Sequence, residues 1–219
     1  MGKPLVLLIR DGWGIGPDFD GNAVKAANTP NVDKLLKEYP NTVIEASGEA
    51  VGVRAGAQGS SEVGHLNMGA GRIVEQEIVR VDKSIRDGSL FQVPRYQEAV
   101  KQCKQTGARF HLMGLVQDQG VHATQGHLFA FIRNLAEAGL RKDQVVVHFF
   151  GDGRDTPPRS ALTYLAELEK AMDEAGVGVI GSVMGRYFAM DRAENWDRTE
   201  KAYRALLYGE GDFTAESAK

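Results

Sequence analysis

The chain has 219 residues, of which 42% are hydrophobic and 25% charged, values typical of a soluble globular protein with one large domain or two small ones. Its formal net charge of −3 excludes a global electrostatic attraction to nucleic acid or to an anionic membrane surface. The single cysteine, Cys103, excludes an intrachain disulfide and a thiolate metal cluster, and no apolar run reaches membrane-spanning length. We therefore expect a cytoplasmic protein whose local clusters of basic residues bind a small anion.

The first predicted element is a strand over residues 4–9, because this run is continuously apolar, as in strands buried on both faces. Asp11 follows it directly, at the expected carboxyl end. Ligands of open α/β sheets bind at such ends, so Asp11 is a candidate site residue. A dinucleotide-binding loop is disfavoured, because Pro17 replaces the third glycine of that fingerprint and an acidic Asp11 would repel pyrophosphate.

A helix is predicted over residues 30–39, with Thr29 as N-cap, and a short strand over residues 42–46. A glycine-rich stretch then leads to the paired hydroxyls of Ser60 and Ser61, which stand at the start of a short helical pattern. A serine at a helix N-terminus can cap the helix or, since that terminus favours anions, carry a phosphate. The local sequence leaves both interpretations open.

Two familiar motifs are excluded around Ser61. A hydrolase nucleophile elbow needs Gly-x-Ser-x-Gly, but Val63 stands where the second glycine belongs, and the Gly-Lys-Ser/Thr of a Walker loop is absent from the sequence. Asp11 and a serine on two loops could instead ligate a hard divalent metal that lowers the pKa of the hydroxyl. A metal needs about four to six donors. With only a few further oxygens and His65 nearby in sequence, the pattern predicts an incomplete metal centre.

The composition becomes more polar after Arg72, and we place a domain boundary near residue 76, dividing the chain into residues 1–76 and 77–219. A regular alternation follows: helix 97–106, strand 109–116, helix 124–138, strand 144–150, helix 159–175, strand 177–183 and helix 194–208. This order predicts an α/β fold in which mainly parallel sheets are flanked by helices.

A polar cluster follows each of these three strands, so the clusters should meet at one edge of the sheet. Arg154, Arg186 and Arg192 would there form a clamp for a ligand with carboxylate and phosphate groups, because guanidinium groups bind such oxygens bidentately. Asp155 could be only a salt-bridge partner of Arg154, or a general acid/base toward a bound hydroxyl.

The histidines near the three strands fall into two kinds, one in a loop and two inside strands. His122 lies in a Gly-x-His loop after the first of these strands, where it can hydrogen-bond to a phosphate or carboxylate. His111 and His148 lie inside apolar strands, and we expect them to be core residues with local hydrogen-bond partners.

Several long motifs occur in order along the whole chain: Asp11-Gly12-Trp13-Gly14, Gly21-Asn22-Ala23, Ala27-Asn28-Thr29-Pro30-Asn31, Ser61-Glu62-Val63-Gly64-His65-Leu66-Asn67, Gly69-Ala70-Gly71-Arg72, Asp152-Gly153-Arg154-Asp155-Thr156-Pro157-Pro158, Gly185-Arg186-Tyr187, Ala189-Met190-Asp191-Arg192 and Trp196-Asp197-Arg198. Together they resemble the cofactor-independent (2,3-bisphosphoglycerate-independent) phosphoglycerate mutase family of the alkaline phosphatase superfamily. The resemblance implies that residues 1–76 are part of an alkaline-phosphatase-like metal and nucleophile domain, and residues 77–219 part of an inserted substrate-binding α/β domain.

The resemblance also implies roles for individual residues. Ser61 would be transiently phosphorylated, and Asp11 with Ser61 would ligate manganese, present as two ions in the complete family enzyme, with Mg²⁺ or another divalent ion as an alternative. Phosphoglycerate would be held by His122, Arg154, Asp155, Arg186 and Arg192, with Asp155 also acting as acid/base. The implied reaction is the glycolytic interconversion of 3-phosphoglycerate and 2-phosphoglycerate.

The sequence departs from the family pattern at three places. Ser60 replaces the usual Asn, and the loop 117–124 keeps His122 but loses neighbouring small and polar residues. The chain ends at Lys219, so most metal ligands and the rest of the substrate domain would come from a carboxyl-terminal segment or a second chain, and we expect the isolated chain to be inactive. The alternative is a non-catalytic phosphoglycerate- or anion-binding module derived from this family.

Overall fold

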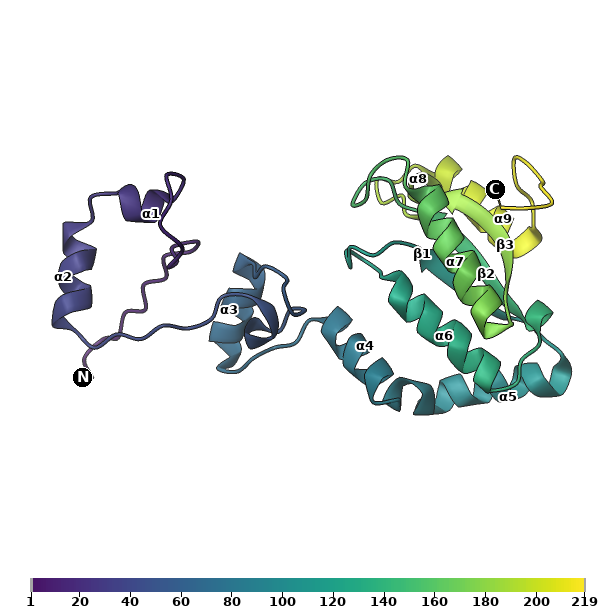
Figure 1. The fold of residues 1–219 in the computed structure, drawn as a ribbon, viewed down its shortest axis with the longest axis horizontal. Coiled ribbons are helices and arrows are strands. Elements are labelled where there is room, and N and C mark those ends of the chain that lie inside the picture. The colour runs from purple at the N-terminus through teal and green to yellow at the C-terminus, as the bar shows by residue number, and fades with distance from the viewer. Residues whose placement is uncertain (1, 219) are drawn as a thin grey trace. The chain divides into compact units, whose positions relative to one another are not determined.

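The structure is a computed structural model that describes residues 2–218. Its internal contacts divide the chain into two compact units, the first ending at Val79 and the second beginning at Arg80 (Figure 1). The roles assigned to the two halves, a phosphatase-like domain and an inserted substrate domain, stay a prediction. Among residues 2–218, no helix combines the length and apolar composition needed to cross a lipid bilayer.

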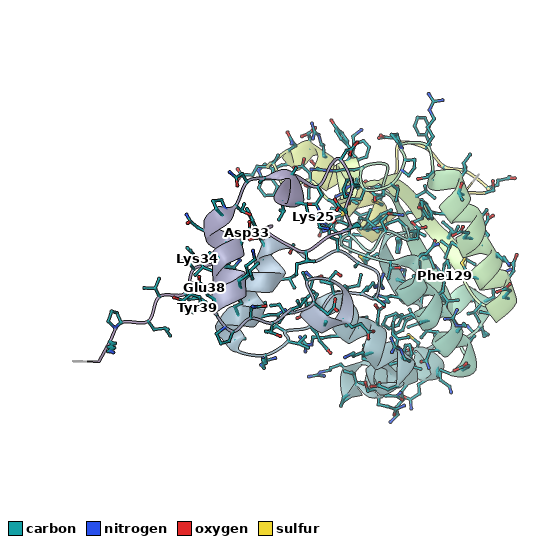
Figure 2. The ribbon with its side chains drawn as sticks, turned by 60° about the vertical axis from the view of Figure 1, so that its left-hand side comes forward. Lys25, Asp33, Lys34, Glu38, Tyr39 and Phe129 are labelled. Carbon is teal, nitrogen blue, oxygen red and sulfur yellow. The ribbon has the colours of Figure 1, made fainter. Side chains whose placement is uncertain are left out.

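The first unit is built from short helices joined by long irregular segments. Its elements are α1 (Ala23–Ala26), α2 (Pro30–Glu38), the 3₁₀ helix η1 (Gly48–Val51) and α3 (Ser61–Ala70), and α4 (Glu77–Arg86) begins at its end. Helix α2 confirms the predicted helix: Thr29 is its N-cap residue, Pro30 occupies the first turn, and Thr29 Oγ1 donates a 3.1 Å hydrogen bond to Asp33 Oδ1. Figure 2 shows Lys34 and Glu38 one turn apart on α2, with Nζ 3.9 Å from Oε2.

The two strands predicted in the first unit are wrong. Residues 4–9 and 42–46 have no regular secondary structure, and Leu5 and Ile44 are 96% and 81% exposed. A strand requires a neighbour to pair with its backbone and cover its apolar side chains. Within the described part of this unit, the only pairing of this kind is one isolated bridge between Ser47 and Gln58.

The second unit confirms the predicted alternation of helices and strands. Its elements after α4 are η2 (Ser89–Gln92), α5 (Pro94–Thr106), β1 (Phe110–Leu115), α6 (Gln125–Glu137), η3 (Lys142–Gln144), β2 (Val145–Gly151), α7 (Ala161–Ala175), β3 (Val179–Gly185), α8 (Arg186–Ala189) and α9 (Trp196–Tyr208). The three strands form one parallel sheet in the order β1-β2-β3, and a helical crossover joins each strand to the next.

Strand β2 is the centre of the core because it has a neighbour on each side. Helices α6 and α7 pack against each other and lie side by side in Figure 1. Val147 and Phe149 of β2 belong to the same buried cluster as Ile132 of α6 and Leu168 of α7. This rigid centre fixes the positions of the loops that follow each strand.

The prediction that His111 and His148 are core residues is confirmed for His148 only. His148 is buried in β2, with Nδ1 2.8 Å from Ser182 Oγ and Nε2 2.9 Å from Nδ1 of His111. His111 has His148 as its hydrogen-bond partner, but its own side chain is exposed. The difference arises because β1 is an outer strand of the sheet, whereas β2 is flanked on both sides.

Candidate functional site

The two adjacent serines at the start of α3 have different roles. Ser60 is the N-cap, and its Oγ accepts a 3.3 Å hydrogen bond from the backbone N–H of Val63. Ser61 is the first residue of the helix. The chain enters this turn through Gly59, where a Cβ would clash with the carbonyl oxygen of Ala46. Because Ser60 caps the helix, the hydroxyl of Ser61 is available for another partner.

That partner is Asp11. Ser61 Oγ donates a 2.6 Å hydrogen bond to Asp11 Oδ2, so the structure brings together the two residues predicted as metal ligands. His65, one turn further along α3, places Nδ1 3.3 Å from Ser61 Oγ and 2.8 Å from the Ser61 carbonyl oxygen. All three residues are exposed. The expected strand before Asp11 is absent, so an irregular segment positions its carboxylate.

The donor atoms at this position fit a hard divalent cation in type but not in number. Carboxylate and hydroxyl oxygens are suitable ligands for such ions, and His65 adds a nitrogen nearby. Within residues 2–218, however, no group of three or more His, Cys, Asp or Glu side chains is arranged to hold a metal ion. Asp11 and Ser61 can therefore supply only part of a coordination shell.

The loops after β2 and β3 meet at the carboxyl edge of the sheet, as predicted from parallel strands. Arg186, the first residue of α8, reaches the turn after β2 and donates from Nη1 to Asp152 Oδ1 at 2.5 Å and to Asp155 Oδ2 at 2.6 Å. Asp152 Oδ1 also accepts from the backbone N–H groups of Arg154 (3.2 Å) and Asp155 (3.3 Å). Gly153 provides the positive φ of 75° that this turn requires.

The charges in this cluster stabilise one another. Burial alone would raise the pKa of Asp152, but the hydrogen bonds from Arg186 and from the backbone hold that pKa below its ordinary value. Hydrogen bonds to Asp152 and then Asp155 raise the pKa of Arg186. Both shifts favour the charged forms, so Asp152 and Arg186 form an ion pair at neutral pH.

The other two arginines of the predicted clamp are exposed. The guanidinium groups of Arg154 and Arg192 make no hydrogen bond or ion pair to residues 2–218. Arg154 lies on the same turn as Asp155, whereas Arg192 follows Asp191, whose Oδ1 accepts from the N–H groups of Ala193 and Asn195. The structure thus joins Arg186 to the Asp152–Asp155 turn and leaves both other side chains open to a ligand.

His122 lies on the loop between β1 and α6. Gln117 is buried and holds this loop, because its Nε2 donates to the carbonyl oxygen of Val121 at 2.6 Å and its Oε1 accepts from the N–H of Gln119 at 2.5 Å. Tyr164 of α7 donates to Asp118 Oδ1 at 2.7 Å, a bond that raises the pKa of Tyr164 to about 12. These hydrogen bonds therefore order the loop that carries His122.

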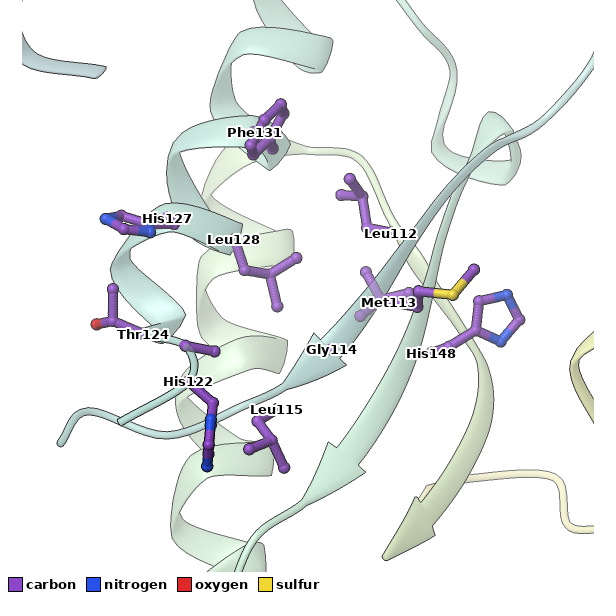
Figure 3. A pocket seen from close by; sticks show the side chains of 12 residues that line it. Leu112, Met113, Gly114, Leu115, His122, Thr124, His127, Leu128, Phe131 and His148 are labelled. Atoms are coloured by element: carbon purple, nitrogen blue, oxygen red, sulfur yellow. The ribbon is translucent and has the colours of Figure 1, made fainter. Parts of the chain in front are cut away.

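His122 itself is exposed, with a positive φ of 65°, and borders a cavity of about 250 Å³ between β1 and the start of α6. Figure 3 shows His122 and Thr124 at one end of this cavity and Leu128 pointing from α6 toward β1. The remaining wall is mostly apolar. An anion would therefore bind at the His122 end and not along the cavity.

Comparison with known proteins identifies the family. Residues 81–219 match the family model described as BPG-independent PGAM N-terminus (iPGM_N). The chain belongs to this family.

Curated relatives of this iPGM_N chain include the 2,3-bisphosphoglycerate-independent phosphoglycerate mutases of Moorella thermoacetica (51% identical over 209 residues, 95% of this chain and 40% of the relative) and Acetivibrio thermocellus (48% over 217 residues, 99% and 42%). A crystal structure of Leishmania mexicana phosphoglycerate mutase at low cobalt concentration is similar with a TM-score of 0.66 and 34% identity, covering 91% of this chain and 38% of that one. The chain thus spans about two fifths of the length of these relatives.

The sequence analysis gave no role to Asp152, which the structure places at the centre of a cluster formed by Asp152, Asp155 and Arg186, called the arginine cluster below. A signal was available, because an Asp that begins a turn commonly accepts hydrogen bonds from N–H groups two or three residues later. The Asp-Gly-Arg-Asp sequence at 152–155 has this pattern.

Proposed function

We propose that this iPGM_N chain is the amino-terminal part of a phosphoglycerate mutase that interconverts 3-phosphoglycerate and 2-phosphoglycerate through a phosphoserine at Ser61. The observation that carries the proposal is the 2.6 Å hydrogen bond from Ser61 Oγ to Asp11 at the start of α3. The similarity to phosphoglycerate mutases along nearly the whole chain supports this reaction over a general phosphatase activity.

Ser61 is suited to take up a phosphoryl group. Its oxygen attacks phosphorus, the bond from phosphorus to the glycerate oxygen breaks, and Asp11 Oδ2 stands 2.6 Å away as acceptor for the hydroxyl proton. The N-terminus of α3 favours the negative charge that then accumulates on Ser61. Asp11 and Ser61 would contribute ligands to Mn²⁺ or another divalent cation, which when bound lowers the pKa of the serine hydroxyl and neutralises phosphoryl oxygens.

The second unit would hold the glycerate while the phosphoryl group is on Ser61. Arg154, Arg186 and Arg192 bind the carboxylate and phosphate oxygens of phosphoglycerate and keep hold of the carboxylate once the phosphoryl group has moved to Ser61, and His122 adds a hydrogen bond. Asp155 gives a proton to the glycerate oxygen that loses phosphorus and takes one from the oxygen that regains it. Retention matters because escape of the glycerate would turn the reaction into hydrolysis. This role would place the protein in glycolysis and in the cytoplasm.

Reconstitution tests the proposal directly. The 219-residue chain, combined with the carboxyl-terminal segment of the Moorella thermoacetica relative and manganese, should convert 3-phosphoglycerate to 2-phosphoglycerate as followed by ³¹P NMR. The same mixture with Ser61→Ala is the matched control and should show no conversion. Binding of 3-phosphoglycerate without conversion, under conditions in which the relative's own full-length enzyme is active, would favour the non-catalytic binding module instead.

A further inference from the structure

Asp152 is the most completely enclosed member of the arginine cluster. Its side chain is fully buried, whereas those of Arg186 and Asp155 are 14% and 21% exposed. A single oxygen, Oδ1, accepts three hydrogen bonds: one from Arg186 Nη1 and two from the backbone N–H groups of Arg154 and Asp155. Asp152 therefore links Arg186, at the junction of β3 and α8, to the turn after β2 that carries Arg154 and Asp155.

Both carboxylates bind the same nitrogen of Arg186. Nη1 donates to Asp152 and to Asp155, while Nη2 and Nε make no hydrogen bond to residues 2–218. A guanidinium group binds carboxylate or phosphate bidentately through two of its nitrogens. The arrangement thus fixes one end of the guanidinium and leaves the other N–H groups for an anionic ligand.

The second oxygen of Asp152 shows that the carboxylate is not present for backbone capping alone. Oδ2 is buried and has no hydrogen-bond partner among the described residues. Burying a charged oxygen without a partner is costly, and a neutral Asn would accept the same two backbone hydrogen bonds through its amide oxygen. The negative charge is therefore explained by Arg186, since a guanidinium in this partly buried position needs an anionic partner.

We propose that Asp152 is a positioning residue for the substrate: it orients Arg186 and holds the Arg154–Asp155 backbone so that these side chains bind phosphoglycerate together. This inference rests on the proposed function. It assigns no contact between Asp152 and the ligand, because Asp152 acts through the residues that it holds.

Whether loss of the Asp152 charge strengthens or weakens anion binding distinguishes a positioning role from a purely electrostatic effect. Removing a negative charge beside an anion site strengthens anion binding if the charge acts only through its field. If Asp152 positions Arg186, its loss weakens binding despite the more positive site. Asp152→Asn is the informative variant, because it can keep both backbone hydrogen bonds and removes only the charge.

The experiment is a calorimetric titration of the 219-residue chain with 3-phosphoglycerate, for the unchanged protein, Asp152→Asn, Arg186→Ala and the double variant. We expect Asp152→Asn to weaken binding about tenfold, in line with loss of a charged hydrogen bond, and to have less than about a twofold effect once Arg186 is Ala. Asp87→Asn is the matched control, since Asp87 caps the N–H of Ser89 outside the cluster, and should leave the affinity unchanged. Circular dichroism melting verifies that each variant is folded.

The outcomes separate the two proposals. Unchanged or tighter binding by Asp152→Asn, together with weaker binding by Arg186→Ala, overturns the positioning role and leaves the proposed function standing. Additive effects in the double variant, or no effect of Arg186→Ala, also overturn it. If the unchanged chain and its reconstituted form both fail to bind 3-phosphoglycerate, the proposed function itself is wrong.

Discussion

Ser61 and Asp11, 50 residues apart in the sequence, are joined by a hydrogen bond of 2.6 Å. The bond exists because Ser60 caps α3 and leaves the neighbouring hydroxyl free. Two adjacent residues of the same type therefore have different partners: Ser60 bonds to the backbone of its own helix, whereas Ser61, which we propose as the nucleophile, bonds to Asp11.

The first prediction follows from this separation. In the reconstituted protein, Ser61→Ala should remove essentially all mutase activity, because the variant lacks the oxygen that is bonded to Asp11. Trapping the phosphorylated protein with acid and mapping the label by mass spectrometry should place the phosphoryl group on Ser61. Label on Ser60 would reverse the assignment.

Ser60→Ala serves as the comparison. It removes the hydrogen bond to the N–H of Val63, and we expect a loss of about 1 kcal/mol in the free energy of unfolding, typical of a lost N-cap. Because Ser61 remains, part of the activity should survive. Ser61→Ala should therefore mainly lose activity, and Ser60→Ala should mainly lose stability.

The arginine side chains give the second prediction. Changing Arg154, Arg186 or Arg192 to Ala should weaken 3-phosphoglycerate binding by about 1.5–3 kcal/mol each, the range for hydrogen bonds to charged groups. Arg186→Ala should in addition lower the melting temperature, because it leaves the buried Asp152 without its cation, whereas Arg154 and Arg192 have no partner within residues 2–218 to lose. Titrations unaffected by all three substitutions would contradict a clamp.

The third prediction concerns pH. Burial, and then the proximity of His111, lower the pKa of His148 below its ordinary value of 6.5. The unfolded chain consequently binds more protons than the folded one, so the stability of the second unit is full above pH 6.5 and falls as the pH drops below it. Denaturant unfolding between pH 7.5 and about 5 should show this loss.

His148→Gln cannot take up the proton and should flatten that part of the profile. His122→Gln is the matched control, because it removes an exposed histidine of the same unit, and it should flatten the profile less than His148→Gln does. A profile of the same steepness in all three proteins would show that His148 does not titrate in this range.

The sequence predicts the second unit well and the first unit poorly for one physical reason. A continuous apolar run shows that a segment needs burial, but not that a partner is available. Val145–Gly151 forms β2 because β1 and β3 pair with it on either side. Residues 4–9 have the same kind of composition but find no neighbouring strand within the described residues of their unit, and Leu8 is 81% exposed.

In the candidate site, too, the sequence predicts which segments meet but not which side chains bond to one another. Strand order was enough to predict that residues 152–155 and Arg186 would meet at one edge of the sheet. It was not enough to predict that Asp152 would be the buried partner, because this depends on the turn geometry set by Gly153 and on Thr156, whose Oγ1 accepts from the N–H of Gly153 at 3.2 Å. The convergence of loops is a property of topology, whereas individual contacts depend on local backbone angles.

The last prediction is that the isolated 219-residue chain is not a competent mutase. Asp11 and Ser61 contribute two donors, and tight divalent-metal sites need several more. Without a firmly held cation, the Ser61 hydroxyl stays neutral and attacks a phosphate dianion poorly. We expect weak Mn²⁺ binding by electron paramagnetic resonance and no turnover from the chain alone, with both restored when the carboxyl-terminal segment of a relative is added. Asp11→Asn should prevent that restoration, because it replaces a carboxylate ligand with a neutral amide of the same size. Robust turnover by the isolated chain would mean that the metal site is completed by residues other than those identified.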